Sequence, residues 1–580
     1  MIVDMKKIHL IVQAKDVSGA LKKLRTIGHV HVEHQEDLKD AMLTEIREDI
    51  TVLENVRRVL QEQKNDVPQV ESDDLEARAD LIMERLALVD ELTESMDARK
   101  KHIDYWEQWG DFNPQDIRDL KDKGLHVELC ELTKEEKSSF DKSVVVEAIS
   151  QKGKKALSVL VSEEAINLPC EPIRLPQVGL KALQHKQCLD HERLAEARTK
   201  LKENARYINF VNENITELED TLNFQEVKKG MRAEEELSVL KGFCPEESCA
   251  QLEDVAKNEQ WALLVEDITE EDNPPTLLKN SKLVNLSKPA LDVIEILPGY
   301  KELDVSAVFL IFFTLFFAML IGDAAYGAIF AIGTVIAHIK LGKKMTDKTP
   351  FLLMYMLTGF TILWGVLTGT YFGQQWLPDS VQPVLPWLNE AVNVQWLCFT
   401  IALVHLTLAR VWAAIVKLPS ITFLSEIGWA LIIWGMYFVA NMFVLNKPLP
   451  VFATWFLMAG IPMALFFMFP PKEIKKVGQE VIPFVLGVIG AGTDIISYIR
   501  LFAVGLATVA VADAANSMPE ALPGVGVGLM IFLHMLNLIL AAMAILVHAI
   551  RLNVLEFSGH LGLEWVGSKY NPFKITKKNN

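Results

Sequence analysis

Two arginines, Arg500 and Arg551, lie inside long apolar segments of the second half of the chain. Charges inside apolar helices are costly and normally functional. Because arginine does not practically deprotonate, each side chain stays cationic at any working pH and needs an anion or water close by. The acids on the same two segments are Asp494, Asp513 and Glu556. A structural salt bridge is the alternative interpretation for each arginine.

Further polar side chains on these two segments could line water-filled paths through a membrane. They are Asp494, Ser497, Thr508, Asp513, His534, Asn537, His548 and Glu556. Glu426, on an earlier apolar segment, is a weaker candidate for the same role, as are His405 and Arg410. Any one of these groups could instead form a satisfied hydrogen bond between helices, and Arg410 and Glu426 could simply reach a membrane face.

Eight apolar segments within residues 301–580 would position these groups, each close to the length needed to cross a ~30 Å hydrocarbon core. They cover residues 305–321, 326–341, 351–372, 394–418, 423–445, 451–469, 482–516 and 525–556. The last two are longer than a perpendicular crossing needs, so they must tilt steeply or project from the bilayer. We therefore expect residues 301–580 to form a transmembrane domain in a lipid membrane.

The charge distribution separates this part of the chain from the rest and orients it. Up to residue 303 the chain has 42 Lys+Arg against 62 Asp+Glu, and beyond it 16 against 13, which together give the net charge of −17. Loops 340–350, 417–422 and 470–480 and the tail after residue 556 hold 12 lysines, whereas the opposite loops hold only Lys447. Positive loops stay in the cytoplasm, so we expect both termini there. The first residues also lack a signal-peptide pattern.

Composition and motifs exclude several other functions. A chain this acidic is a poor binder of nucleic acid. The six cysteines are scattered, and the short gap between Cys244 and Cys249 is weak evidence for a metal, so we expect reduced structural thiols. The sequence has no Gly-x4-Gly-Lys-Ser/Thr loop and no His-Glu-x-x-His pair. We therefore expect no ATP site, no metal, no cofactor and no catalysis by this chain on its own.

Residues 1–300 have the pattern of a stalk. Residues 7–12, 17–27 and 29–32 indicate strand, helix and strand, and a similar unit follows the second helical arm. Together these units predict a proximal α/β lobe formed by residues 1–40 and 236–290. Heptad spacings predict coiled-coil arms at 41–110 and 180–235, with a globular distal lobe at 111–179. An antiparallel hairpin of such arms would span on the order of 75 Å.

The expected fold class is therefore a mostly α membrane protein. About eight transmembrane helices follow a cytosolic α+β domain that carries a long antiparallel coiled-coil hairpin. The alternative for the first arm is one helix of an ordinary bundle, because its apolar stripe alone does not specify the partner.

Several motifs, in the same order along the chain, resemble one known family. Ser497-Tyr-Ile-Arg-Leu-Phe-Ala-Val-Gly-Leu-Ala and His548-Ala-Ile-Arg-Leu-Asn-Val-Leu-Glu-Phe resemble the two signature helices of the V-type/A-type ATPase membrane subunit I, or subunit a. Gly322-Asp-Ala-Ala-Tyr-Gly, Gly369-Thr-Tyr-Phe-Gly and Gly242-Phe-Cys-Pro-Glu-Glu resemble further elements of this family. The resemblance covers essentially the whole chain.

The resemblance implies a role as the stator of a rotary ion pump. Arg500 would face a ring of proteolipid c/K subunits, each with one membrane carboxylate, and would stabilise the ionised carboxylate so that it releases H⁺ or Na⁺ before passing. Arg551 would support this field between two half-channels. Further partners implied are peripheral stalk subunits of the E/G type, a central-stalk or socket subunit, and the soluble head that hydrolyses or makes ATP. The expected location is a prokaryotic plasma membrane.

Two departures from the eukaryotic pattern leave the half-channel lining and the ion open. Thr508 stands where a histidine often occurs, and Ala541 stands where an acid commonly precedes the second arginine. The alternative function is a secondary transporter with a regulatory cytosolic coiled-coil domain. It would predict an inverted repeat, and the eight segments show no evident internal symmetry. A scaffold that merely anchors a coiled coil gives no reason for two arginines in the bilayer.

Overall fold

The computed structural model describes residues 1–33, 40–62, 75–141, 143–152, 155–164, 172–234, 236–343, 345, 347–373, 383–470 and 477–575. The chain divides into two compact units. We call them the helical unit (Met1–Leu10, His29–Val32 and Lys241–Phe573) and the arm unit (Ile11–Gly28, Glu33–Leu240 and Lys574–Asn580). Most of the predicted loop 470–480 lies outside the described residues.

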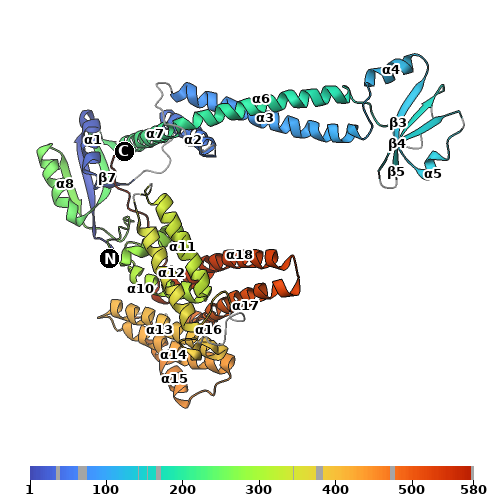
Figure 1. The fold of residues 1–580 in the computed structure, drawn as a ribbon. Coiled ribbons are helices and arrows are strands. Elements are labelled where there is room, and N and C mark those ends of the chain that lie inside the picture. The colour runs from blue at the N-terminus through green and yellow to red at the C-terminus, as the bar shows by residue number, and fades with distance from the viewer. Residues whose placement is uncertain are drawn as a thin grey trace. The chain divides into compact units, whose positions relative to one another are not determined.

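The arm unit is built on four long helices: α2 (Ala41–Glu62), α3 (Leu75–Glu107), α6 (Leu180–Asn204) and α7 (Ile208–Gly230). Figure 1 shows α3 and α6 side by side. They run antiparallel, because Trp106 near the end of α3 packs with Leu180 at the start of α6. Leu201, Val211 and Ile215 pack with apolar side chains of α2 and α3 in one shared core. The arms therefore pair along the apolar stripe that the heptads indicate.

A three-stranded antiparallel sheet, in the order β3-β5-β4, lies at one end of this helix pair (Figure 1). Its strands are β3 (His126–Thr133), β4 (Val145–Lys152) and β5 (Lys155–Ser162), and α4 (Pro114–Asp122) and α5 (Lys134–Lys137) accompany them. Leu129 and Leu157 bury their side chains with Trp106, Trp109 and Leu180. This contact fixes the sheet to the helix ends.

Shorter elements complete the arm unit. These are η1 (Ala14–Asp16), α1 (Val17–Ile27), η2 (Ala205–Tyr207) and β6 (Arg232–Glu234). Helix α1 has the predicted bounds, and Arg25 at its end forms an ion pair of 2.7 Å with Asp220 of α7. Strand β6 pairs antiparallel with the first residues of β7.

The helical unit contains both a sheet and the apolar helices. Strands β2 (His31–Val32), β7 (Leu237–Pro245), β1 (Met5–Gln13) and β8 (Ala262–Glu266) are hydrogen-bonded in that order. The residues of β1 after Leu10 and of β7 before Lys241 belong to the arm unit. Helix α8 (Glu246–Asn258) connects β7 to β8, and η3 (Val284–Ser287) and α9 (Lys288–Val293) precede the apolar helices. His31 and Val32 pair antiparallel with Phe243 and Gly242.

The apolar segments fold as helices. They are α10 (Ser306–Ile321), α11 (Ala324–Leu341), α12 (Thr349–Thr368), α13 (Ala391–Lys417), α14 (Phe423–Leu445), α15 (Val451–Phe466), α16 (Val477–Ser497), α17 (Ile499–Ala521) and α18 (Gly526–Ala544), with η4 (Pro386–Asn389) before α13. Six spans in the described part of the chain are long and apolar enough to cross a membrane, with α16 and α17 counted as one continuous span. The 16-residue helices α10 and α15 are shorter, ~24 Å each.

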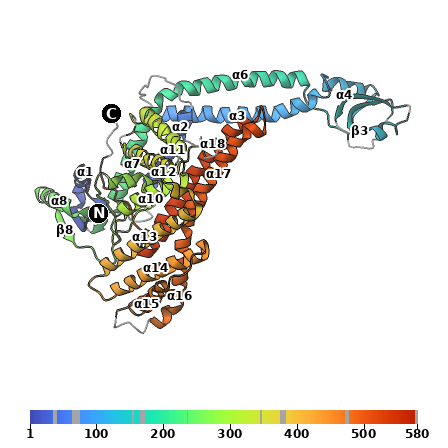
Figure 2. The same cartoon turned by 60° about the horizontal axis from the view of Figure 1, so that its bottom comes forward.

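The last two spans are less regular than one continuous α-helix each. The segment expected at 482–516 is interrupted at Tyr498, where α16 ends and α17 begins. After α18 the backbone forms two π-helical segments, η6 (Ile545–Ala549) and η7 (Leu552–Phe557), and then the short helix α19 (Ser558–Leu561). Figure 2 shows α17 and α18 side by side.

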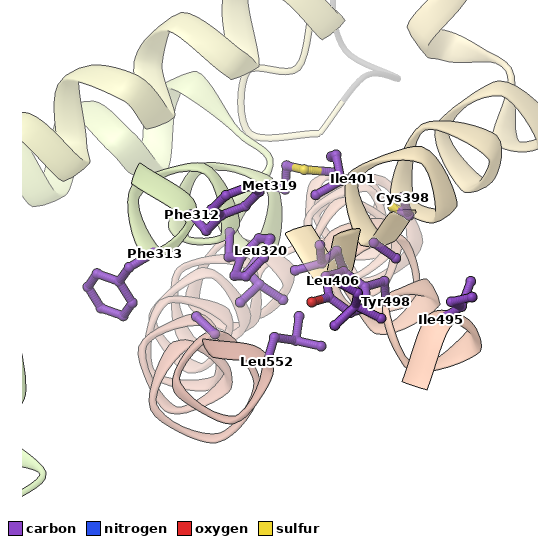
Figure 3. Packing of buried hydrophobic residues seen from close by; sticks show 14 of the residues in the cluster. Phe312, Phe313, Met319, Leu320, Cys398, Ile401, Leu406, Ile495, Tyr498 and Leu552 are labelled. Carbon is purple, nitrogen blue, oxygen red and sulfur yellow. The ribbon is translucent and has the colours of Figure 1, made fainter. Parts of the chain in front are cut away.

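The core of the helical unit lies between α10, α13 and the last two spans. Leu320, Leu406, Tyr498 and Leu552 are all almost fully buried there, and Figure 3 shows them meeting between these helices. At Gly505 on α17, a Cβ atom would come within 2.6 Å of the carbonyl oxygen of Met319 on α10. Small residues allow such close approach of membrane helices. This packing fixes the segment that carries Arg500.

Candidate functional site

Arg500 lies at the start of α17, directly after the interruption at Tyr498. Its Nε donates a hydrogen bond to the Ser497 carbonyl oxygen at 2.9 Å, and one Nη donates to Oε1 of Glu556 at 2.7 Å. The Arg500 side chain is 23% exposed, whereas that of Glu556 is 5% exposed. The guanidinium is therefore held from within the chain while part of the side chain remains accessible.

Arg551 contacts the same carboxylate oxygen. Its Nε lies 3.5 Å from Oε1 of Glu556, and its side chain is 55% exposed. We call Arg500, Arg551 and Glu556 the arginine site. A salt bridge within the chain, the alternative left open by the sequence, is thus present. However, two guanidinium groups share one carboxylate, so the ionised arginine site keeps one net positive charge.

A buried tyrosine–histidine pair in the core lies next to the segment that carries Arg500. The Tyr498 hydroxyl and Nδ1 of His405, on α13, lie 2.8 Å apart. The His405 ring is stacked between Phe312 and Phe557, with centroid distances of 3.8 and 4.4 Å. His405 is fully buried, so it serves the packing of α13 against α17 rather than an accessible path.

A group of polar residues, the Tyr326 cluster, lies toward the end of the bundle where α10 turns into α11 and α17 into α18. Nδ1 of His534 is 2.7 Å from the Tyr326 hydroxyl, and its Nε2 is 3.1 Å from Oδ1 of Asn516. Asn537 donates to the Tyr326 hydroxyl at 3.0 Å and to the Thr508 carbonyl oxygen at 2.8 Å. The predicted residues His534, Asn537 and Thr508 are therefore brought together on α17 and α18.

The Gly322-Asp323 turn attaches this cluster to the loop after α12. Gly322 ends α10 with φ of 67°, a conformation that glycine adopts at little cost. The Asp323 carboxylate caps α11 by accepting from the backbone N–H groups of Ala325 and Tyr326. Its other oxygen accepts from the N–H of Gly373 at 2.9 Å. Two of the family-like motifs thus bind each other.

A chain of charged and imidazole groups, the Arg410 chain, lies toward the opposite end of the bundle, where α13 turns into α14. Glu426 accepts from Lys417 at 2.6 Å and from Arg410 at 2.8 Å. Arg410 also donates to Nδ1 of His560 at 3.2 Å, and Nε2 of His560 lies 2.9 Å from Asp494. The predicted residues Glu426 and Asp494 are therefore joined through two residues on other helices.

The remaining predicted residues have separate places. Asp513 adjoins Gly373, because a Cβ atom on that glycine would collide with its carboxylate. His548 lies on η6 and is half-buried, and its Nδ1 has no hydrogen-bond partner among the described residues. At Ser497 it is the carbonyl oxygen, rather than the hydroxyl, that contacts Arg500.

Sequence reasoning did not include Tyr326, Asn516, Asp323 and His560 among the candidate residues. Tyr326 and Asp323 belong to a motif that the sequence already singles out, and His560 follows Glu556 by four residues. Asn516 ends the segment predicted as the seventh helix. Among the described residues no group of three or more His, Cys, Asp or Glu side chains could hold a metal ion.

Comparison with known proteins identifies the family. No family model matches the chain. A V-type ATP synthase subunit I from Borreliella burgdorferi is 31% identical over 615 residues, covering 100% of both chains. A V-type ATP synthase subunit I 1 from Treponema pallidum is 27% identical and covers 99% of this chain and 100% of the relative. An A-type ATP synthase subunit I from Pyrococcus abyssi is 26% identical over 53% of this chain and 48% of the relative.

A solved structure is also similar in part. It is titled as the cytoplasmic N-terminal domain of subunit I, homolog of subunit a, of V-ATPase, with 14% identity, a TM-score of 0.21, and coverage of 45% of this chain and 99% of that chain. At this TM-score the likeness carries no argument here. The full-length match to the Borreliella burgdorferi protein shows the family: this chain belongs to the subunit I family of V/A-type ATP synthases, and its described apolar helices are those of a multi-pass membrane protein.

Proposed function

We propose that this chain is the membrane stator of a rotary V/A-type ATPase and forms the ion half-channels against the proteolipid c/K ring. The observation that carries this proposal is the arginine site, with its net positive charge and a partly accessible Arg500. A rotor carboxylate that meets this charge is stabilised in its ionised form, so it must give up its ion before it moves on. The relatives, named as ATP synthase subunits, give no support to a secondary transporter.

The Tyr326 cluster and the Arg410 chain lie on either side of Arg500 along the helices, as two half-channels would require. Along α16 and α17, Thr508 follows Arg500 by eight residues and Asp494 precedes it by six, which correspond to about 12 and 9 Å of helix. The Tyr326 cluster would line the path on the non-cytoplasmic side, and the Arg410 chain the path on the cytoplasmic side, in agreement with the positive loops. Arg500 and Glu556 lie between them.

The arm unit suits the mechanical part of this function. The paired helices α3 and α6 would resist torque and present their sheet to peripheral stalk subunits of the E/G type. The acidic surface of residues 1–300 favours basic partner surfaces. The proximal lobe at 1–40 and 236–290 would lie near the central-stalk or socket subunit. The expected location is a prokaryotic plasma membrane with both termini in the cytoplasm.

The experiment is ATP-driven ion transport by the intact complex in lipid vesicles, with and without sodium. We expect the unaltered chain to copurify with a proteolipid ring and stalk subunits. Arg500→Ala is expected to assemble equally well but to stop coupled transport. Purification of an active chain without these partners would contradict the proposal. The sodium dependence identifies the transported ion.

A further inference from the structure

Glu556 is the one acidic residue in contact with both arginines among the described residues. We propose that Glu556 is a positioning residue that sets the net charge of the arginine site at one positive charge and holds Arg500 by one edge of its guanidinium. This inference rests on the proposed function and deepens it. It changes the role predicted for Glu556, which the sequence places among the half-channel lining.

The π-helical backbone makes the contact between Arg551 and Glu556 possible. These residues are five apart, and in a regular α-helix, with 3.6 residues per turn, they would point about 140° away from each other. Segment η7 covers Leu552–Phe557, and its i→i+5 hydrogen bonding brings position 556 back over position 551. The 3.5 Å contact therefore depends on a local backbone form that often occurs at functional sites.

The hydrogen bonds of Arg500 show how it is held. A guanidinium has five N–H donors in a planar fork. Within the described residues, Arg500 donates only to the Ser497 carbonyl oxygen and to Glu556. The remaining donors are free to meet a carboxylate from outside, because the side chain is 23% exposed. Glu556 thus fixes the direction of the guanidinium without occupying all of it.

Arg551 determines how the Glu556 carboxylate changes the net charge that acts on a passing rotor carboxylate. With Arg500 alone, a buried Glu556 would cancel the positive charge that acts on a passing rotor carboxylate. Arg551 restores one unit of positive charge. Without Glu556 the two guanidinium groups would carry two units and would repel each other, and a rotor carboxylate would be released more slowly. Either change from one unit is expected to slow the passage of the ring.

Three variants of the intact complex distinguish an effect of the net charge of the arginine site from a purely structural role of Glu556. Arg551→Gln leaves the site with no net charge, Glu556→Gln leaves it with two positive charges, and the double variant returns it to one. We expect each single variant to reduce ATP-driven ion transport about tenfold, because one unit of charge added or removed beside the passing rotor carboxylate shifts its pKa, and one pKa unit is a factor of ten in its ionisation equilibrium. We expect the double variant to recover to within about threefold of the unaltered complex, a coupling that a double-mutant cycle measures.

A structural role for Glu556 alone predicts a different result, because the double variant would then show the product of the two losses. That outcome would overturn the charge-setting role. If Glu556→Gln does not assemble, Glu556→Asp keeps the charge and is expected to retain most of the transport; a loss as large as that of Arg551→Gln would also overturn it. Failure of the proposed function is distinguishable, since it requires coupled transport by Arg500→Ala.

Discussion

The Tyr498 hydroxyl lies 2.8 Å from Nδ1 of His405, in the core of the helical unit and two residues before Arg500. Both side chains are fully buried. This hydrogen bond joins α13 to the point between α16 and α17 where the long span is interrupted. The position of the arginine site therefore depends on a hydrogen-bonded pair that is itself buried in the core.

We expect Tyr498→Phe to lower the stability of the helical unit by about 1–3 kcal/mol, because it leaves the buried His405 nitrogen without its hydrogen-bond partner. The measurement is the Tm of the purified complex, followed together with ATP-driven transport. Tyr437→Phe is the control, since among the described residues that hydroxyl has one hydrogen bond, a longer one of 3.3 Å with Thr400. Equal Tm values for the two variants would show that the Tyr498 hydrogen bond contributes nothing.

Tyr326→Phe tests the Tyr326 cluster as part of an ion path. The hydroxyl joins His534 and Asn537, so its removal interrupts the polar connection while the ring still fills its place. We expect transport to fall several-fold with normal assembly. Tyr355→Phe, which removes a similar hydroxyl bonded to His338 at 3.0 Å outside this cluster, should leave transport unchanged. The same loss of transport in both variants would show that the Tyr326 cluster is not part of an ion path.

Arg99→Ala tests the pairing of the arms. Arg99 on α3 and Asp190 on α6 form an ion pair of 2.8 Å, with side chains only 10% and 7% exposed. Removing Arg99 leaves the buried Asp190 carboxylate with only the exposed Arg193, 3.7 Å away, so we expect a cost near the lower end for a broken buried pair, about 3 kcal/mol. The control Arg57→Ala breaks an exposed pair with Glu54, worth about 0.5 kcal/mol. Thermal unfolding followed by circular dichroism should show a clearly lower Tm for Arg99→Ala and an almost unchanged Tm for Arg57→Ala.

The pH dependence of stability should reveal the contribution of the ionised Asp272 carboxylate. Hydrogen bonds from Lys7 and from the hydroxyl and N–H of Thr269 hold the pKa of its carboxyl well below its usual range. Because the folded pKa is the lower one, this contribution is complete above the unfolded pKa of about 4 and is lost as the pH falls toward the folded pKa. Asp272→Asn should therefore lower Tm at pH 6, by an amount that decreases below pH ~4. A constant difference would contradict this assignment.

Much of the fold follows from periodicity. The spacing of residues 17–27 predicts α1 with its observed bounds, and the heptads indicate the apolar stripe along which α3 and α6 pair. The interruption at Tyr498 and the π-helical segments were not predictable, because apolar composition alone does not distinguish an α-turn from a π-turn. They depend on packing between helices that are distant in sequence.

The candidate site was predictable only in part, for the same reason. Arg500, Arg551 and Glu556 stand out because charge in an apolar segment is costly. Their shared contact was not predictable, since five-residue spacing places side chains on different faces of an α-helix. Tyr326 and His560 were missed because a tyrosine or histidine at the end of an apolar segment carries no such penalty. Only the fold brings them to His534 and Asp494.

The most direct test of the central claim is the number of ions transported per ATP hydrolysed by the reconstituted complex that carries Arg500→Gln. Lys447→Gln, which removes a cation from a loop between α14 and α15, is the matched control. We predict that the control keeps the ratio of the unaltered complex and that Arg500→Gln assembles but transports no ions against a gradient. An unchanged ratio for Arg500→Gln would contradict the account, because the charge at position 500 would then be unnecessary for coupling.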